Sequence, residues 1–309
     1  MSTLCFIDWQ PSLEILKIGG FSLRWYSFLW CVGLLFAYLI VQKLYKQQKI
    51  ADEKFEPLFL YCFFGVLIGA RLGHCLFYEP EYYLGSVKGV MEMILPVRFA
   101  PDTWDWEFRG YEGLASHGGA IGLTAALILY VRKIKVPVLT VLDNVAIATP
   151  LTACCIRLGN LMNSEIIGSP TDLPWGFLFH TRDALVEGVL VPRHPAQLYE
   201  ALAYLCIFIA EIAIYRKFGI QDTHSHKPIM PQTSTEKHTG SMSAGTGFYF
   251  GFCLTTIFVF RFFVEFIKKE QVDFEEGMLL DMGQLLSIPF IIAGIIFMLR
   301  SKQAATQNK

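Results

Sequence analysis

Four polar side chains, Arg157, Asn160, Asn163 and Glu165, lie close together in the stretch CIRLGNLMNSEIIG at residues 155–168. The stretch follows directly on a long apolar run. Polar and charged groups at the edge of a membrane-spanning segment are unfavourable, so a sequence that keeps several of them together indicates a functional site. The forked donors of an arginine are suited to binding a phosphate group.

Other apolar segments carry further polar residues. Arg261 and Glu265 are four residues apart on one helix face, where they are expected to pair. His117 lies in the motif SHGGAIG, and a histidine can accept a proton from a nucleophile. Glu200 opens another apolar run. Each residue alone also has a structural explanation, an intrahelical ion pair or an interhelical hydrogen bond. Together they indicate a site for an anionic substrate.

The composition indicates the elements that must position these groups. Of 309 residues, 53% are apolar and only 17% are charged, where soluble proteins have roughly 25% charged residues. This predicts a polytopic, all-α membrane protein. The net charge of −1 does not suggest a nucleic-acid partner. The eight cysteines form no C-x-x-C pair, so we interpret them as small core residues and expect no metal site and no cofactor. We also expect no cleaved signal peptide.

About seven apolar runs are long enough to cross a hydrocarbon core of roughly 30 Å, which takes about 20 residues. They lie near residues 21–42, 57–78, 113–131, 137–157, 196–215, 246–267 and 279–299. We therefore predict a single integral membrane domain over residues 1–309. Gly65, Gly69 and Gly73 are spaced for close helix packing.

Basic residues follow the first, third, fifth and last runs, which places these loops on the cytoplasmic side. The N-terminus is then outside, the C-terminus is inside, and the polar residues described above lie toward the outer half. Asp143 and Asn144 lie deeper and are expected to bond neighbouring helices. Residues 219–245, rich in Ser, Thr, His, Pro and Gly, are expected to form a flexible cytoplasmic linker. Its histidines, His224, His226 and His238, have no carboxylate or cysteine at ligand spacing.

The stretch at 155–168 resembles a diagnostic segment of the prolipoprotein diacylglyceryl transferase family, which usually reads G-R-x-G-N-F-x-N-x-E. Other blocks resemble that family in the same order: LRWYSFLW, GARLGHCLFY, SHGGAIG, PRHPAQLYEA, RFFVEFIK and MGQLLSIP. The resemblance covers about residues 8–299. It implies a bundle of seven membrane helices with periplasmic arms in the bacterial inner membrane. It also implies an N-terminus in the periplasm, a cytoplasmic C-terminus, and an active site toward the periplasmic side.

The resemblance implies transfer of an sn-1,2-diacylglyceryl group from phosphatidylglycerol to the lipobox cysteine of a preprolipoprotein. The products would be a thioether and glycerol phosphate, as the first step of lipoprotein maturation. The resemblance assigns His117 as a general base, Arg157 as the phosphate ligand, and Arg261 as its assistant. Further residues are assigned to substrate binding or its support: Tyr26 lining the lipid cavity, Asn160 and Glu165 at the headgroup, Gly168 allowing tight backbone passage, and Glu265 holding Arg261. Glu200 and His194 are expected to be structural supports.

Some positions depart from the family pattern. Ile156, Leu161 and Ser164 replace the usual Gly, Phe and Gly, and Ile257 stands where a tyrosine is often found. Two other readings stay open from the residues alone. A transporter would distribute its polar residues through the membrane depth and show repeated halves. A lipid-binding scaffold would need the arginines but not His117.

Overall fold

The computed structural model describes residues 6–18, 21–100, 102–108, 113–219, 242–268 and 280–307. The predicted linker at 219–245 lies outside the described residues except for Gly219 and residues 242–245. His224, His226 and His238 are also outside them, as are residues 269–278 between the last two predicted apolar runs. The described chain divides into two compact units, one of residues 1–49 and 138–309 and one of residues 50–137. We call them the first and the second unit and describe each by itself.

The protein is mostly helical, which confirms the predicted all-α membrane class. In the described part of the chain, six helices are long and apolar enough to cross a membrane. They are α1 (Trp25–Gln47), α2 (Asp52–Phe77), α6 (Val138–Met162), α7 (Ala196–Ile214, extended by the π-helix Tyr215–Gly219), α8 (Phe248–Glu265) and α9 (Met282–Gln307). The segment predicted at 113–131 forms α5 (Ser116–Ile134), which is not among these six. The count of seven spans therefore stays a prediction.

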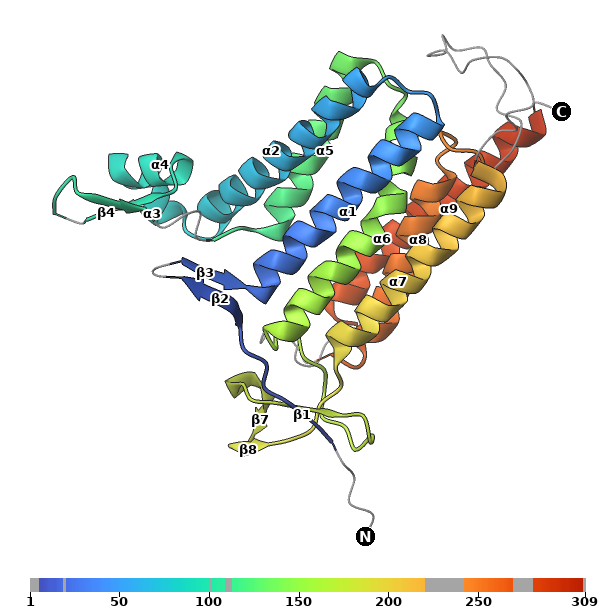
Figure 1. Cartoon of the computed structure of the whole chain (residues 1–309). Coiled ribbons are helices and arrows are strands. Elements are labelled where there is room, and N and C mark those ends of the chain that lie inside the picture. Colours follow the sequence, from blue (N-terminus) through green and yellow to red (C-terminus); the bar gives the residue numbers. More distant parts are fainter. Residues whose placement is uncertain are drawn as a thin grey trace. The chain divides into compact units, whose positions relative to one another are not determined.

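The first unit is a helical bundle in which α6 is central. Helix α6 packs against α1, α7 and α8, and α8 packs against α9 (Figure 1). Most of the buried residues of α6 are small or apolar, so its neighbours approach it closely on several sides. One end of α6 carries Arg157 and Asn160. The helix continues to Met162, one turn beyond the boundary predicted at residue 157.

Asp143 and Asn144, both fully buried, join helices as predicted. The Asp143 carboxylate accepts hydrogen bonds from the backbone N–H groups of Gly245, Gly247 and Phe250, at 2.8, 2.9 and 2.9 Å. It therefore caps the N-terminus of α8, where unpaired N–H groups and the helix dipole favour an anion. Asn144 and Gln48 exchange two side-chain hydrogen bonds, which tie α6 to the residue after α1.

Short strands extend the first unit beyond its helices. Strand β1 (Ile7–Trp9) pairs in parallel with β6 (Phe177–Phe179). Antiparallel pairs are formed by β2 (Glu14–Ile18) with β3 (Phe21–Arg24), and by β7 (Leu185–Val186) with β8 (Val189–Leu190). A 3₁₀ turn at Arg182–Ala184 precedes β7. The Trp9 indole donates to the carbonyl of Leu161 at 3.0 Å, so the N-terminal segment is fixed to the end of α6.

The second unit is built on α2 and α5, whose glycines meet face to face. An added Cβ at Gly69 would lie 2.4 Å from the Gly118 carbonyl oxygen and 2.7 Å from Gly122 Cα. Residues with no side chain are therefore required there, as the glycine spacing predicted. The same unit carries a small arm: α3 (Pro80–Leu84), α4 (Val87–Ile94), and the antiparallel pair β4 (Val97–Phe99) and β5 (Trp106–Phe108).

The described cysteines, which are all except Cys5, are free thiols. Four of them are buried, namely Cys75, Cys154, Cys155 and Cys253. The prediction that cysteines serve as small core residues holds for these four. Cys31 and Cys206 are exposed on α1 and α7.

Candidate active site

The end of α6 turns back on itself directly after Met162. The backbone N–H of Glu165 donates to the carbonyl of Asn160 at 3.0 Å, and Ser164 and Ile166 have left-handed backbone angles, φ 54° and 58°. A left-handed φ is unusual for any residue other than glycine and is most unfavourable for a β-branched one such as Ile166. Residues with strained backbone angles are often found at functional sites, where the surrounding structure holds them in that conformation.

This turn places the Glu165 carboxylate beside two asparagines of the same stretch. Asn160 Nδ2 donates to it at 3.2 Å and Asn163 Nδ2 at 3.0 Å. Asn160 in turn accepts a hydrogen bond from Arg157 Nη1 at 3.3 Å. The Gln197 side chain of α7 donates to the carbonyl of Glu165. The four polar residues of the stretch therefore form one chain of hydrogen bonds, which orients the Arg157 guanidinium.

Residues of α7 and of the end of α8 complete a charged network around Arg157. Arg157 Nε lies 3.0 Å from Glu200 Oε2, on the first turns of α7. Lys268 Nζ, just after α8, lies 3.3 Å from Glu200 Oε1 and 3.2 Å from Glu265 Oε2. The Tyr204 hydroxyl donates to Glu200 Oε1 at 3.1 Å. We call Arg157, Glu200, Lys268 and Glu265 the charged network.

Burial explains why Glu200 needs these partners. Its side chain is 0% exposed, and those of Arg157 and Lys268 are 15% and 3% exposed. An isolated buried carboxylate is very unfavourable, whereas two cations and a hydroxyl offset its charge. Glu200 was expected to be a structural support, and it is the shared partner of both cations. Its burial among residues of three elements could not be deduced from its place in the sequence.

A junction of three backbone segments sets the position of this network. Gly168 N–H donates to the carbonyl of His194 at 2.9 Å, Ser169 N–H donates to that of Ile267 at 2.8 Å, and Gly168 faces Lys268 in a β-bridge. An added Cβ at Gly168 would lie 2.5 Å from His194 Cβ and 2.8 Å from the Ile267 oxygen. The tight backbone passage predicted for Gly168 is therefore present, and it connects the segments that follow α6, precede α7 and follow α8.

His194 occupies the same junction. Its Nδ1 lies 3.3 Å from the Tyr199 hydroxyl, which also accepts a hydrogen bond from the Trp175 indole at 2.9 Å. Partial burial lowers the pKa of His194 below its ordinary value, which favours the neutral imidazole. This matches the structural support expected from the sequence.

Tyr26, the second residue of α1, lies against the last turns of α6. An added Cβ at Gly159 would be 3.0 Å from Tyr26 Cδ2, so the glycine admits the ring. The tyrosine is thus brought next to the stretch that holds Arg157 and Asn160. Its predicted place in a lipid cavity stays a prediction.

The structure does not form the ion pair expected between Arg261 and Glu265. Glu265 pairs with Lys268, three residues on, and Arg261 has no ion pair with any residue that the structure describes. The turn at 266–268 explains the difference, because it folds Lys268 back over the last turn of α8. Arg261 lies on α8, one turn before Glu265.

His117 is the second residue of α5 and is exposed. It belongs to the second unit, whereas Arg157 belongs to the first. Its predicted meeting with the arginines therefore stays a prediction.

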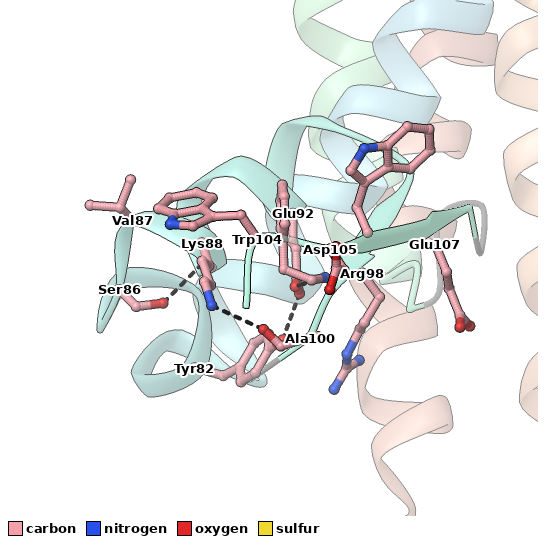
Figure 2. Close-up of a pocket in the computed structure, with 13 residues that line it drawn as sticks. Tyr82, Ser86, Val87, Lys88, Glu92, Arg98, Ala100, Trp104, Asp105 and Glu107 are labelled. Carbon is pink, nitrogen blue, oxygen red and sulfur yellow. Dashed lines mark hydrogen bonds between the residues drawn. The ribbon is translucent and has the colours of Figure 1, made fainter. Parts of the chain in front are cut away.

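The arm of the second unit contains a cavity of about 930 Å³ (Figure 2). Its polar groups are already engaged: Lys88 Nζ donates to the carbonyls of Ala100 and Thr103, both at 2.9 Å, and Glu92 accepts from the Tyr82 hydroxyl at 2.6 Å. Burial and the bond to Glu92 raise the pKa of Tyr82 to about 12, so the hydroxyl remains a donor. These contacts hold the arm together, and the charged network is the better candidate for chemistry.

Comparison with known proteins identifies the family. The sequence pattern described as prolipoprotein diacylglyceryl transferase matches residues 14–300. This chain belongs to that family. It is 52% identical over 295 residues to the phosphatidylglycerol–prolipoprotein diacylglyceryl transferase of Bacteroides fragilis, covering 96% of this chain and 95% of the relative. The proteins of the same description from Tolumonas auensis and Porphyromonas gingivalis are each 38% identical, covering 95% and 100% of this chain and 96% and 99% of their own lengths.

Family membership confirms the resemblance that the motifs indicated and, with it, the predicted transferase class. The roles predicted for individual side chains stay predictions. Sequence reasoning missed Lys268, which lies outside the predicted site. The sequence did contain a signal for this residue. Lys268 follows directly after the block that holds Arg261, on the predicted outer side, whereas basic residues favour cytoplasmic loops.

Proposed function

We propose that the charged network is where this protein transfers a diacylglyceryl group from phosphatidylglycerol to the cysteine thiol of a prolipoprotein. One observation carries the proposal. Arg157 Nε forms an ion pair with the fully buried Glu200 carboxylate, and Arg157 Nη1 donates to Asn160, so its guanidinium is held between two partners. A guanidinium fixed by its neighbours can offer its remaining donors to a phosphate without reorganising.

In this reaction the cysteine thiolate attacks the glycerol carbon that carries the phosphate. A sulfur–carbon bond forms, the carbon–oxygen bond breaks, and the electron pair leaves with the oxygen of glycerol phosphate. Negative charge gathers on the phosphate as the bond breaks, and Arg157, assisted by Arg261, would stabilise it. The thiol must lose its proton to become a good nucleophile, and His117 would accept that proton.

The neighbouring residues would bind and align the lipid. Asn160 and Glu165, linked at 3.2 Å, would contact the glycerol headgroup or orient Arg157. Tyr26 would line the path of the acyl chains. Gly168 would act through the backbone junction, and Glu265 would act through Lys268.

The cellular setting belongs to the same proposal. The chain would lie in the bacterial inner membrane with its N-terminus in the periplasm, its C-terminus in the cytoplasm, and the site toward the periplasm. The protein partner would be a preprolipoprotein signal peptide with its lipobox cysteine. No cofactor is required for this chemistry, because the protein supplies the base and the phosphate ligands.

The test is transfer by the purified full chain in detergent, with glycerolipid-labelled phosphatidylglycerol and a lipobox peptide. Arg157→Ala should give no thioether product, and Arg157→Lys should retain little activity, because an ammonium lacks the forked donors. Arg300→Ala, at an exposed position on α9, is the matched control and should be fully active. Full transfer by Arg157→Ala would refute the phosphate-binding role.

A further inference from the structure

Lys268 is fixed in the network from two directions. Its backbone faces Gly168 in the β-bridge, and its backbone N–H donates to the carbonyl of Glu265 at 3.1 Å. Its side chain is 3% exposed and reaches two carboxylates, Glu200 and Glu265. A lysine carries a flexible four-carbon stem, so holding it buried between two anions takes a defined backbone and two good partners.

The formal charges of the network depend on this lysine. Arg157 and Lys268 carry one positive charge each, and Glu200 and Glu265 carry one negative charge each, so the network sums to zero. Arg261, one turn before Glu265 on α8, adds one positive charge, and Glu165, which accepts from Asn160, adds one negative charge, so the site as a whole is also neutral. Without Lys268, the carboxylates of Glu200 and Glu265 would face one network arginine, and the site including Arg261 and Glu165 would carry a net charge of −1.

The two carboxylate oxygens of Glu200 contact different cations. Oε2 lies against Arg157 Nε, and Oε1 lies against Lys268 Nζ and the Tyr204 hydroxyl. A carboxylate shared in this way holds the Nε edge of Arg157 while Lys268 offsets its negative charge. The guanidinium donors that neither Glu200 nor Asn160 engages then meet an incoming anion while the positive charge of Arg157 is largely available.

We propose that Lys268 is a positioning residue for the transfer reaction: by balancing Glu200 and Glu265, it lets Arg157 be fixed by a carboxylate and still bind the phosphate of an anionic lipid. This inference rests on the proposed role of Arg157. It identifies Lys268 as a determinant of lipid affinity that acts through Glu200 and does not itself touch the substrate.

The experiment measures KM for phosphatidylglycerol and kcat with the full chain in mixed micelles. Lys268→Met should raise KM about tenfold, the size expected when one charge is removed beside a binding site at the effective dielectric of proteins. Lys268→Arg, which keeps the charge, should stay near the wild-type KM. The decisive variant is Lys268→Met combined with Glu265→Gln, which restores the net charge and should recover most of the lost affinity.

A purely structural role for Lys268 predicts a different result for the double variant. Replacing Glu265 as well would then raise KM further or leave it as high as in Lys268→Met. A double variant no better than Lys268→Met, with both proteins folded, would overturn the proposal, as would an unchanged KM in Lys268→Met. If Lys268→Met does not accumulate, the double variant is compared with wild type directly. A KM near wild type then supports the proposal, and a tenfold higher KM overturns it. An unaffected KM in Arg157→Lys would instead contradict the proposed phosphate ligand.

Discussion

Glu200 Oε2 lies 3.0 Å from Arg157 Nε, and the Glu200 side chain is 0% exposed. The pair joins α7 to the end of α6, close to Asn160 and Glu165. A buried carboxylate that serves two cations contributes to both stability and orientation, so its removal affects both.

Replacing Glu200 with Gln should reduce transfer activity about 100-fold, because Arg157 loses the anion that fixes its Nε edge and small misplacements at a site have effects of that size. Stability should fall by about 3–5 kcal/mol, since the buried Lys268 and the largely buried Arg157 lose their shared partner. Activity in micelles and a denaturant midpoint measure the two effects. Glu187→Gln, on the exposed β7–β8 turn, should change neither. A fully active, fully stable Glu200→Gln would contradict the central place of this carboxylate.

Asp143→Ala should destabilise the protein by about 3 kcal/mol while leaving the chemistry of the folded fraction intact. The substitution removes the acceptor of three backbone N–H groups at the start of α8, which would then lose their hydrogen bonds. Thermal unfolding in detergent measures the loss of stability, and activity per folded molecule measures the effect on the chemistry. Thr149→Ala, exposed on the same helix, is the control. Lost turnover in a stable Asp143→Ala protein would show that the residue does more than cap a helix.

The residues of the site differ in how far the sequence could predict them. Arg157, Asn160, Asn163 and Glu165 lie within nine residues, so their association follows from a helix end and a turn. The i,i+4 spacing of Arg261 and Glu265 suggested a pair, but a turn after α8 brought Lys268 to Glu265 instead. Local spacing predicts contacts along one helix, and contacts across three elements depend on packing that the sequence does not display.

The fold, like the site, has parts that the local sequence predicts and parts that depend on tertiary packing. Apolar runs of span length were sufficient to predict the long helices, since a membrane imposes their length. The turn after Met162, with a β-branched residue in left-handed conformation, could not be predicted because local preference opposes it. The backbone junction at Gly168 is what imposes that path, and it is a property of the folded chain.

Gly168→Ala tests this junction. The new Cβ would meet backbone and Cβ atoms of His194 at 2.5–2.6 Å, and these atoms have little freedom to move. Destabilisation of about 1–3 kcal/mol is expected from the overpacking. Transfer should fall further than stability alone explains, because the shift moves Lys268. Gly119→Ala is the control, since its Cβ would find ordinary contacts at 3.6–3.8 Å. An active Gly168→Ala protein would show that the junction does not set the position of the network.

Ile166→Asn tests the strain in the turn. At φ 58° an isoleucine is strongly disfavoured, whereas asparagine accepts a left-handed backbone readily. The half-buried side chain has modest apolar contacts to lose, so the variant should be more stable by about 1 kcal/mol, the lower end of such strain. Activity should remain within about twofold, because the backbone path that places Glu165 against Asn160 and Asn163 is kept. Ile166→Val, still β-branched, should resemble the wild type in both measurements. A clear loss of stability in Ile166→Asn would mean that the packing of this side chain outweighs its strain, and that the turn is held by apolar contact more than by the junction at Gly168.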